Sequence, residues 1–213
     1  PTRLQASARI EQARVAGTGS AFPATFDPLG GLPVEFGVVR NFTPMSGSLG
    51  LLQELGGGWV VSLTGSYVER APRAQELYSK GPHEASGTFE IGDPNLRKEK
   101  AQTIELGLRR SQGSWRAEAT AFYTRYNGFI YKRLTGLTCD DDFATCGSGG
   151  GTELRQVVFT QQDATFYGAE LRGQVDVGEI AGGTFGVEGR YDFVRAQFAD
   201  GTNVPRIPPH RLG

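Results

Sequence analysis

The stretch Trp115-Arg116-Ala117-Glu118-Ala119-Thr120-Ala121-Phe122-Tyr123 decides the fold. Its odd positions are apolar or aromatic, whereas Arg116, Glu118 and Thr120 occupy even positions. An alternation of period two is typical of a β-strand with one polar face. The stretches that begin at Trp59 and Phe185 repeat this pattern, and in all three an aromatic residue opens the apolar row and another closes it eight residues later. The sequence therefore predicts strands with one apolar and one polar face.

The length of these apolar rows favours a membrane. Eight steps of about 3.3 Å give roughly 26 Å of strand, and a tilt of about 40° leaves roughly 20 Å along the membrane normal, close to the apolar band of an outer-membrane barrel. Aromatic rings at both ends fit this interpretation, because an amphipathic ring is most stable at headgroup depth. A soluble antiparallel sandwich also alternates, and it is the alternative interpretation.

The composition limits the possible classes of protein. The 213 residues include 31 glycines, and 38% of them are hydrophobic. No run approaches the roughly 20 apolar residues of a transmembrane helix. A membrane barrel is compatible with this low hydrophobicity, because only every second residue of its strands must be apolar. The net charge of -1 argues against a nucleic-acid partner, which would favour a basic surface.

The predicted connections alternate between long and short. Expected strands cover about 4–10, 37–55, 59–69, 97–110, 115–131, 154–177 and 185–198. The long connections are 18–36, 70–95, 134–153 and the stretch from Asp200 onward, and the short ones are 56–58, 111–114 and 178–183. Outer-membrane barrels have short periplasmic turns and long extracellular loops. Because Trp59, Trp115 and Phe185 follow short turns, we expect all three at the periplasmic rim, a segregation that a sandwich does not predict.

The fold class predicted from this pattern is all-β, an antiparallel transmembrane β-barrel. About seven strands with an eighth begun would form an open curved sheet, and open edges are very costly in lipid. We therefore expect residues 1–213 to be part of a larger barrel; a complete eight-stranded barrel is the runner-up. The charged residues opposite the apolar rows should line the barrel lumen; they are Glu105, Arg109, Arg116, Glu118, Glu170, Arg172, Glu188, Arg190 and Asp192.

Several motifs resemble one family. They are Glu69-Arg70-Ala71-Pro72, Glu76-Leu77-Tyr78, Gly81-Pro82-His83, Phe89-Glu90-Ile91-Gly92-Asp93-Pro94-Asn95-Leu96, Lys98-Glu99, Glu105-Leu106-Gly107, Tyr167-Gly168-Ala169-Glu170 and Arg206-Ile207-Pro208-Pro209-His210-Arg211-Leu212-Gly213. Together they resemble the barrel of TonB-dependent outer-membrane receptors. The resemblance implies a 22-stranded barrel around an N-terminal plug, in the outer membrane of a Gram-negative bacterium, with transport energised through TonB. The plug and the terminal strands are expected to lie outside residues 1–213.

The same resemblance suggests a cargo. The Glu-Leu-Tyr-x-x-Gly-Pro-His variant of the loop is similar to a subgroup that includes zinc-uptake receptors. Zinc is therefore the first expectation for the transported substrate, and a ferric siderophore or heme the alternative. The expected partners are TonB, the plug, outer-membrane lipid and a metal or metal chelate. A small outer-membrane or soluble binding or adhesion module without transport is the alternative function.

The long loops hold the candidate site residues. His83 beside Glu84 could bind Zn²⁺ if the plug supplied further ligands, and the alternative is a solvated loop histidine. Tyr78 and His83 are expected to help capture substrate. The second long loop is also expected to help capture substrate, through Asp140, Asp141 and Asp142. These carboxylates could attract cations, but they lack the spacing of a helix-loop-helix Ca²⁺ site.

Other chemistry receives less support. Cys139 and Cys146 lie seven residues apart in a loop, which favours a disulfide in an oxidising compartment over two unpaired thiols. His210, between Pro209 and Arg211, is expected to pack rather than to bind metal.

No enzymatic motif is present: Gly87 replaces the second histidine of a helical zinc-protease motif, and no Gly-x-Ser-x-Gly or phosphate-binding loop occurs. We expect no enzyme and no catalytic cofactor, although a barrel hydrolase would be indicated by a serine close to a histidine.

Overall fold

The computed structural model describes residues 1–21, 34–140, 146, 154–180 and 182–213. Part of the expected loop 18–36, and both Asp141 and Asp142, lie outside these residues. Within the described ranges, no helix is long and apolar enough to cross a membrane.

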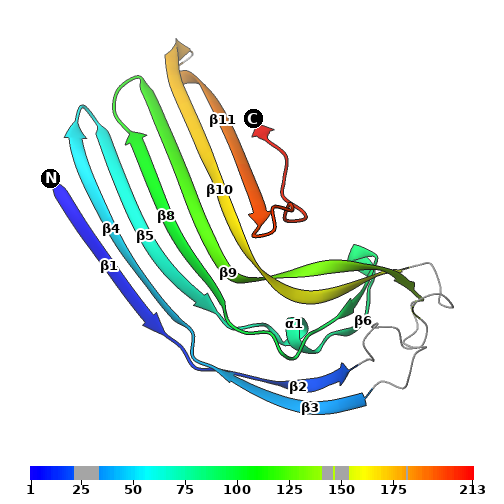
Figure 1. The fold of residues 1–213 in the computed structure, drawn as a ribbon. Helices are drawn as coiled ribbons and strands as arrows, with labels where there is room; N and C mark the ends of the chain where they lie inside the picture. Colours follow the sequence, from blue (N-terminus) through cyan, green and yellow to red (C-terminus); the bar gives the residue numbers. More distant parts are fainter. Residues whose placement is uncertain (22–33, 141–145, 147–153, 181) are drawn as a thin grey trace.

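The main feature is one curved antiparallel sheet that does not close on itself (Figure 1). Its strands follow the order β1 (Thr2–Ile10), β4 (Met45–Gly56), β5 (Trp59–Arg70), β8 (Glu99–Arg110), β9 (Trp115–Cys139), β10 (Leu154–Ile180), β11 (Gly183–Phe198) and β12 (Arg211–Leu212). Each strand pairs antiparallel with its neighbours on this path. The predicted all-β class and the open curved sheet are confirmed.

The register brings the apolar positions of all the long strands onto one face. At mid-height, directly paired residues form a single row across the sheet: Leu4, Leu51, Leu63, Leu106, Ala121, Ala169 and Phe193. The adjacent row, which faces the other way, is mostly polar: Arg3, Leu52, Ser62, Gly107, Thr120, Glu170, Asp192 and Arg211. Side chains alternate between faces along a strand, so a slip of one residue would exchange the two surfaces.

No second layer covers the apolar face within the described residues. Leu63 is 48% exposed and Leu106 is 52% exposed, although both lie in the middle of the sheet. A sandwich would bury these side chains between two sheets, so the sandwich interpretation is wrong. Contiguous exposed apolar surface of this kind marks an interaction with a partner or a membrane.

The aromatic residues that follow short turns lie at one end of the sheet. The rings of Trp59 and Trp115 meet edge to face with centroids 5.7 Å apart, and the Arg110 guanidinium lies 4.0 Å above the Trp115 ring. Phe185 is at the same end, because Val187 pairs with Val175, which pairs with Trp115. The expected common rim is confirmed.

The expected loop 18–36 and strand 37–55 are partly wrong. β2 (Ala13–Ala21) and β3 (Val34–Phe42) form a separate antiparallel ribbon, and β4 begins only at Met45. β2 consists largely of small residues, whose hydrophobic alternation is too weak to predict a strand. Pro44, which has no amide proton to donate to a ladder, separates β3 from β4.

The tightly packed core lies beyond one end of the sheet. The loop expected at 70–95 contains α1 (Ala74–Tyr78), β6 (Lys80–His83), a 3-10 turn (Glu84–Ser86) and β7 (Thr88–Ile91). β9 also runs to Cys139, into the loop expected at 134–153. Two clusters of buried apolar residues, centred on Phe89 and Leu77, join these elements to β9 and β10. A third cluster, centred on Phe198, joins β9 and β10 to β11 and the stretch that follows it.

The two faces should respond differently to charge. Leu106→Arg places a guanidinium at mid-height on the apolar face, whereas Glu105→Arg places it one residue away on the polar face. We expect Leu106→Arg to lower the free energy of unfolding of the full-length protein in lipid vesicles by about 2–4 kcal/mol. The matched Glu105→Arg variant should change it by less than about 1 kcal/mol. Equal losses in a denaturant titration would contradict this assignment of the faces.

Candidate functional site

The long connection between β5 and β8 is held against β9 and β10, at the end of the sheet opposite the short turns (Figure 1). β6 pairs antiparallel with β7, and β7 pairs in parallel with the start of β10. α1 begins where the Arg73 amide donates a hydrogen bond of 2.8 Å to Oε2 of Glu76. Its fully buried Leu77 packs with Ile130 and Phe159. This long connection therefore has a defined structure.

An ion-pair network fastens both ends of this connection. Arg70, the last residue of β5, donates from Nη1 to Oε2 of Glu76 at 2.8 Å and from Nε to Oε1 of Glu99 at 3.2 Å. Glu99 also accepts a hydrogen bond of 2.7 Å from the Ile130 amide. Because Glu76 lies in α1 and Glu99 begins β8, Arg70 joins the entry, the helix and the exit of the connection.

The structure brings His83 close to a different carboxylate from the one expected. Nδ1 of His83 lies 2.8 Å from Oγ of Ser86 and 3.9 Å from Oε1 of Glu90, whereas Glu84 forms no ion pair with it. Thr88 pairs with His83 across β6 and β7, and Glu90 follows two residues along on the same face. Sequence reasoning missed Glu90 because the pairing of β6 with β7 is not visible in a linear pattern.

Glu90 already has several partners. Its buried carboxylate accepts hydrogen bonds from Nε2 of Gln75 at 3.0 Å and from Nζ of Lys132. The His83 side chain is 45% exposed. In the described part of the chain, no group of three or more His, Cys, Asp or Glu side chains could hold a metal ion. A metal bound at His83 would therefore need further ligands from outside these residues.

The other expected loop residues lie apart from His83. The Tyr78 ring covers Gly17 so closely that a Cβ there would lie 2.5 Å from its Cδ2, and the Tyr78 hydroxyl donates to the Val15 carbonyl at 3.4 Å. Tyr78 thus packs α1 against the β2–β3 ribbon. Asp140 is half-buried at the end of β9. A role of Tyr78 or Asp140 in substrate capture remains a prediction.

Cys139 and Cys146 form a disulfide with an S–S distance of 2.02 Å. Both cysteines are buried in one cluster with Phe89 and Ile91, which belong to β7 in the long connection between β5 and β8. The disulfide therefore lies where the two long connections meet.

An aromatic cluster at this end was not expected from the sequence. Gly128 has a φ of +67° and donates its amide to Oδ1 of Asp163 at 2.8 Å, in a β-bulge between β9 and β10. The extra residue shifts the alternation, so that rings on both sides of the bulge continue the polar, interior face of the sheet. The cluster consists of Tyr126, Phe129, Tyr131, Phe166 and Phe198. An Asn-Gly pair inside a strand was the available signal for the bulge.

The rings of this aromatic cluster form one connected patch. Phe129 and Tyr131 are nearly parallel, with an interplanar angle of 11°, and the Tyr131 and Phe198 centroids are 4.5 Å apart. Burial raises the pKa of the Tyr131 phenol, which donates to Oε1 of Gln162 at 3.0 Å. Phe198 is buried, whereas the other four rings keep part of their surface exposed.

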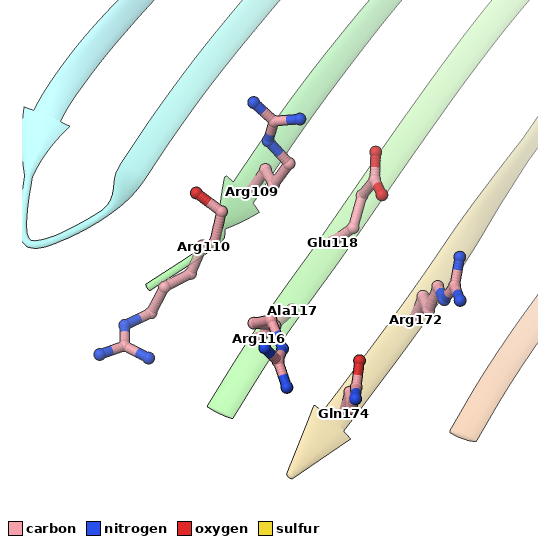
Figure 2. Close-up of a pocket in the computed structure, with 8 residues that line it drawn as sticks. Arg109, Arg110, Arg116, Ala117, Glu118, Arg172 and Gln174 are labelled. Atoms are coloured by element: carbon pink, nitrogen blue, oxygen red, sulfur yellow. The ribbon is translucent and has the colours of Figure 1, made fainter. Parts of the chain in front are cut away.

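The interior face is charged near the opposite end. Figure 2 shows Arg109, Glu118 and Arg172 side by side on β8, β9 and β10, around a hollow of about 190 Å³. Arg172 also pairs with Glu188 at 2.8 Å. The expected polar lining, with ion pairs between its own members, is therefore present on this face.

The Arg70 network yields a testable prediction. Arg70→Met would leave the two partner carboxylates without their cation, and removing one partner of such a pair costs about 3 kcal/mol. We expect amides of residues 74–91 in the full-length protein to exchange hydrogen faster in this variant. Arg73→Met is the control, because Arg73 is exposed and no ion pair of its side chain is found among the described residues. Unchanged exchange in Arg70→Met would show that the network does not order the loop.

Several known proteins are similar to this chain. The family model described as TonB dependent receptor-like, beta-barrel matches residues 1–213. The copper transporter OprC superposes with a TM-score of 0.71 at 19% identity, over 99% of this chain and 29% of that one. The siderophore receptor PirA from Pseudomonas aeruginosa gives a TM-score of 0.51 at 17% identity, over 89% and 32% of the two chains.

Two further relatives concern heme and hemoglobin. A Serratia marcescens hemophore receptor, HasR, solved with its hemophore HasA and heme, superposes with a TM-score of 0.52 at 14% identity, over 92% of this chain and 30% of that one. Hemoglobin-haptoglobin utilization protein B of Neisseria meningitidis is 35% identical over 72 residues, 34% of this chain and 9% of that protein.

The chain thus spans a third or less of the length of these relatives. The solved structures share its fold, and the family model covers it from end to end. The exposed apolar rows, the rim aromatic residues and the charged interior face are those of an outer-membrane barrel wall. The chain belongs to the TonB-dependent receptor-like β-barrel family of the Gram-negative outer membrane.

Proposed function

We propose that the full-length protein takes up a scarce metal across the outer membrane as a complex with an organic ligand, with energy supplied through TonB. The similar proteins named for copper transport, siderophore reception and hemophore reception support uptake of a metal or metal chelate. A complexed form is favoured by the aromatic cluster, which is the single observation that carries this proposal.

The position of the aromatic cluster suits a planar ligand. Tyr126 and Phe166 lie on the interior face, and Phe129 and Tyr131 extend the same patch toward the long connections. Partly exposed rings bind flat aromatic or conjugated groups by offset stacking and edge-to-face contact. Heme and aryl-bearing ferric siderophores present such groups. Capture would bring the ligand to the mouth of the barrel.

The charged interior face supports a plug partner. Arg116 pairs with Asp176, and Arg211 pairs with Asp192 at 2.8 Å. Neither Arg109 nor Arg190 has an acidic partner within 4.0 Å among the described residues. We expect such side chains to pair with a plug domain.

Ser86 lies within hydrogen-bond distance of His83, the juxtaposition that a barrel hydrolase would require, but the Ser86 hydroxyl donates to the His83 carbonyl at 3.2 Å and contacts Oγ1 of Thr88 at 2.6 Å. Because that hydroxyl proton is already engaged by the turn, we expect the barrel itself to have no catalytic role.

Zinc is the second candidate cargo, and His83 favours it. Its imidazole is exposed and lies near the Glu90 carboxylate, a donor pair that suits Zn²⁺. The plug would have to supply the remaining ligands.

The aromatic proposal can be tested with two tyrosines of one strand. Tyr131→Ala removes a ring from the aromatic cluster, whereas Tyr123→Ala removes one from the apolar face of β9. We expect about tenfold weaker binding of heme or of an aryl ferric siderophore to the full-length Tyr131→Ala receptor, and little change for Tyr123→Ala. Fluorescence titration of the detergent-purified proteins measures both. Equal affinities for all three proteins would remove the aromatic cluster from the ligand site.

Calorimetric titration of the full-length receptor with Zn²⁺ tests the second candidate. If zinc is the cargo and His83 a ligand, His83→Ala should weaken Zn²⁺ binding strongly. His210→Ala is the matched control, because His210 directly precedes β12 and packs against β11, where its Nδ1 is 2.6 Å from the Tyr191 hydroxyl. Unchanged affinity in His83→Ala would exclude His83 from a zinc site.

A further inference from the structure

A polar pocket opens on the apolar side of the sheet, where the aromatic residues end the hydrocarbon-facing rows. It encloses about 520 Å³. Its lining includes Tyr67, Arg97, Lys98, Lys100, Gln102 and Asn127. The pocket lies at the end of the strands from which the long connections start. In this family fold that end is the extracellular one, so the pocket is at the depth of the outer-leaflet headgroups.

The register fixes the face on which this pocket opens. On β8, Lys100 and Gln102 continue the alternate positions of Ile104 and Leu106, which belong to the apolar face. Gln102 pairs with Tyr67 on one side and with Arg125 on the other. The polar side chains therefore point outward from the barrel, directly beyond the apolar rows.

The charges around this pocket do not cancel. Glu69 forms an ion pair with Lys98 through Oε2. Its second carboxylate oxygen, Oε1, lies 3.9 Å from Nζ of Lys100. Asp163, the other acid, accepts the Gly128 amide at 2.8 Å. Arg97 lines the pocket, and Arg125 lies beside it as the β9 partner of Gln102. Both are exposed, and no carboxylate of the described residues lies within 4.0 Å of either guanidinium. Four cations thus face two carboxylates at the membrane surface.

We propose that this pocket binds the phosphate group of an anionic outer-leaflet lipid. Guanidinium groups bind phosphate through paired hydrogen bonds, and the amides of Gln102 and Asn127 add neutral donors. The lipid is favoured over a dissolved anion because the pocket borders the apolar face. A phosphate held beside Tyr67 leaves the acyl chains of the same molecule lying along Ile104 and Leu106. Basic residues just outside the hydrocarbon are a recurrent means of holding anionic lipids.

The test uses the full-length receptor in nanodiscs of phosphatidylcholine with or without diphosphoryl lipid A. We expect the wild type to retain lipid A, measured by native mass spectrometry, and R97Q/R125Q to bind it about thirtyfold more weakly. These two arginines were chosen because they form no ion pair with the described residues, so that the Lys98–Glu69 pair stays intact. The control R133Q/R155Q makes the same substitutions at exposed positions of β9 and β10 beyond the membrane, and it should bind like the wild type.

Two results would overturn the proposal. One is equal lipid A retention by R97Q/R125Q and R133Q/R155Q. The other is full displacement of lipid A by inorganic phosphate at matched concentration, which would make the pocket a site for dissolved anions. Neither readout involves uptake of a metal complex, so the lipid proposal and the transport proposal can fail separately.

Discussion

The structure depends on the exclusion of water from one face of a single sheet. In hydrocarbon, a backbone amide or carbonyl without a partner is very costly, so each strand must be paired on both sides while it crosses. The same surroundings demand apolar side chains at alternate positions only, which leaves the other positions free to be polar. The row from Leu4 to Phe193 and the adjacent row from Arg3 to Arg211 are the direct result. One register thus separates lipid from lumen across the whole sheet.

Beyond the membrane, a different set of forces gives the chain its order. There the elements of the long connection supply the apolar contacts, and they bury Leu77 of α1 and Phe89 of β7 against β9 and β10. Arg70 and the buried disulfide fasten this region at its base and near its tip. The bulge at Gly128 turns aromatic rings toward the interior. A stiff wall therefore carries a structured mouth, where ligand capture is proposed, and a basic pocket on its outer side, where a lipid is proposed.

The strands of the membrane wall could be predicted from the sequence, because alternation of apolar and polar residues is a local pattern within each strand. Alternation from Trp115 to Tyr123 and the short turns before Trp59 and Phe185 gave the strands, their direction and the aromatic rim. β2 was missed because small residues such as Gly17 and Gly19 show little alternation. Two other features could not be predicted because they depend on how strands pair. They are the approach of His83 to Glu90 and the change of side-chain alternation at the Gly128 bulge. The zinc expectation used His83 and Glu84 as neighbours in the chain, and folding separates their roles.

The most direct test of the central claim is a spin-label scan of Trp115 to Tyr123 in the full-length receptor, reconstituted in lipid vesicles. Single labels would be introduced with the native disulfide intact, and their relaxation measured with oxygen, which enters lipid, and with a water-soluble nickel chelate. We predict strong oxygen relaxation at residues 117, 119 and 121 and strong nickel relaxation at residues 116, 118 and 120. Loss of this alternation, or the opposite phase, would contradict the account of the sheet as a wall between hydrocarbon and water.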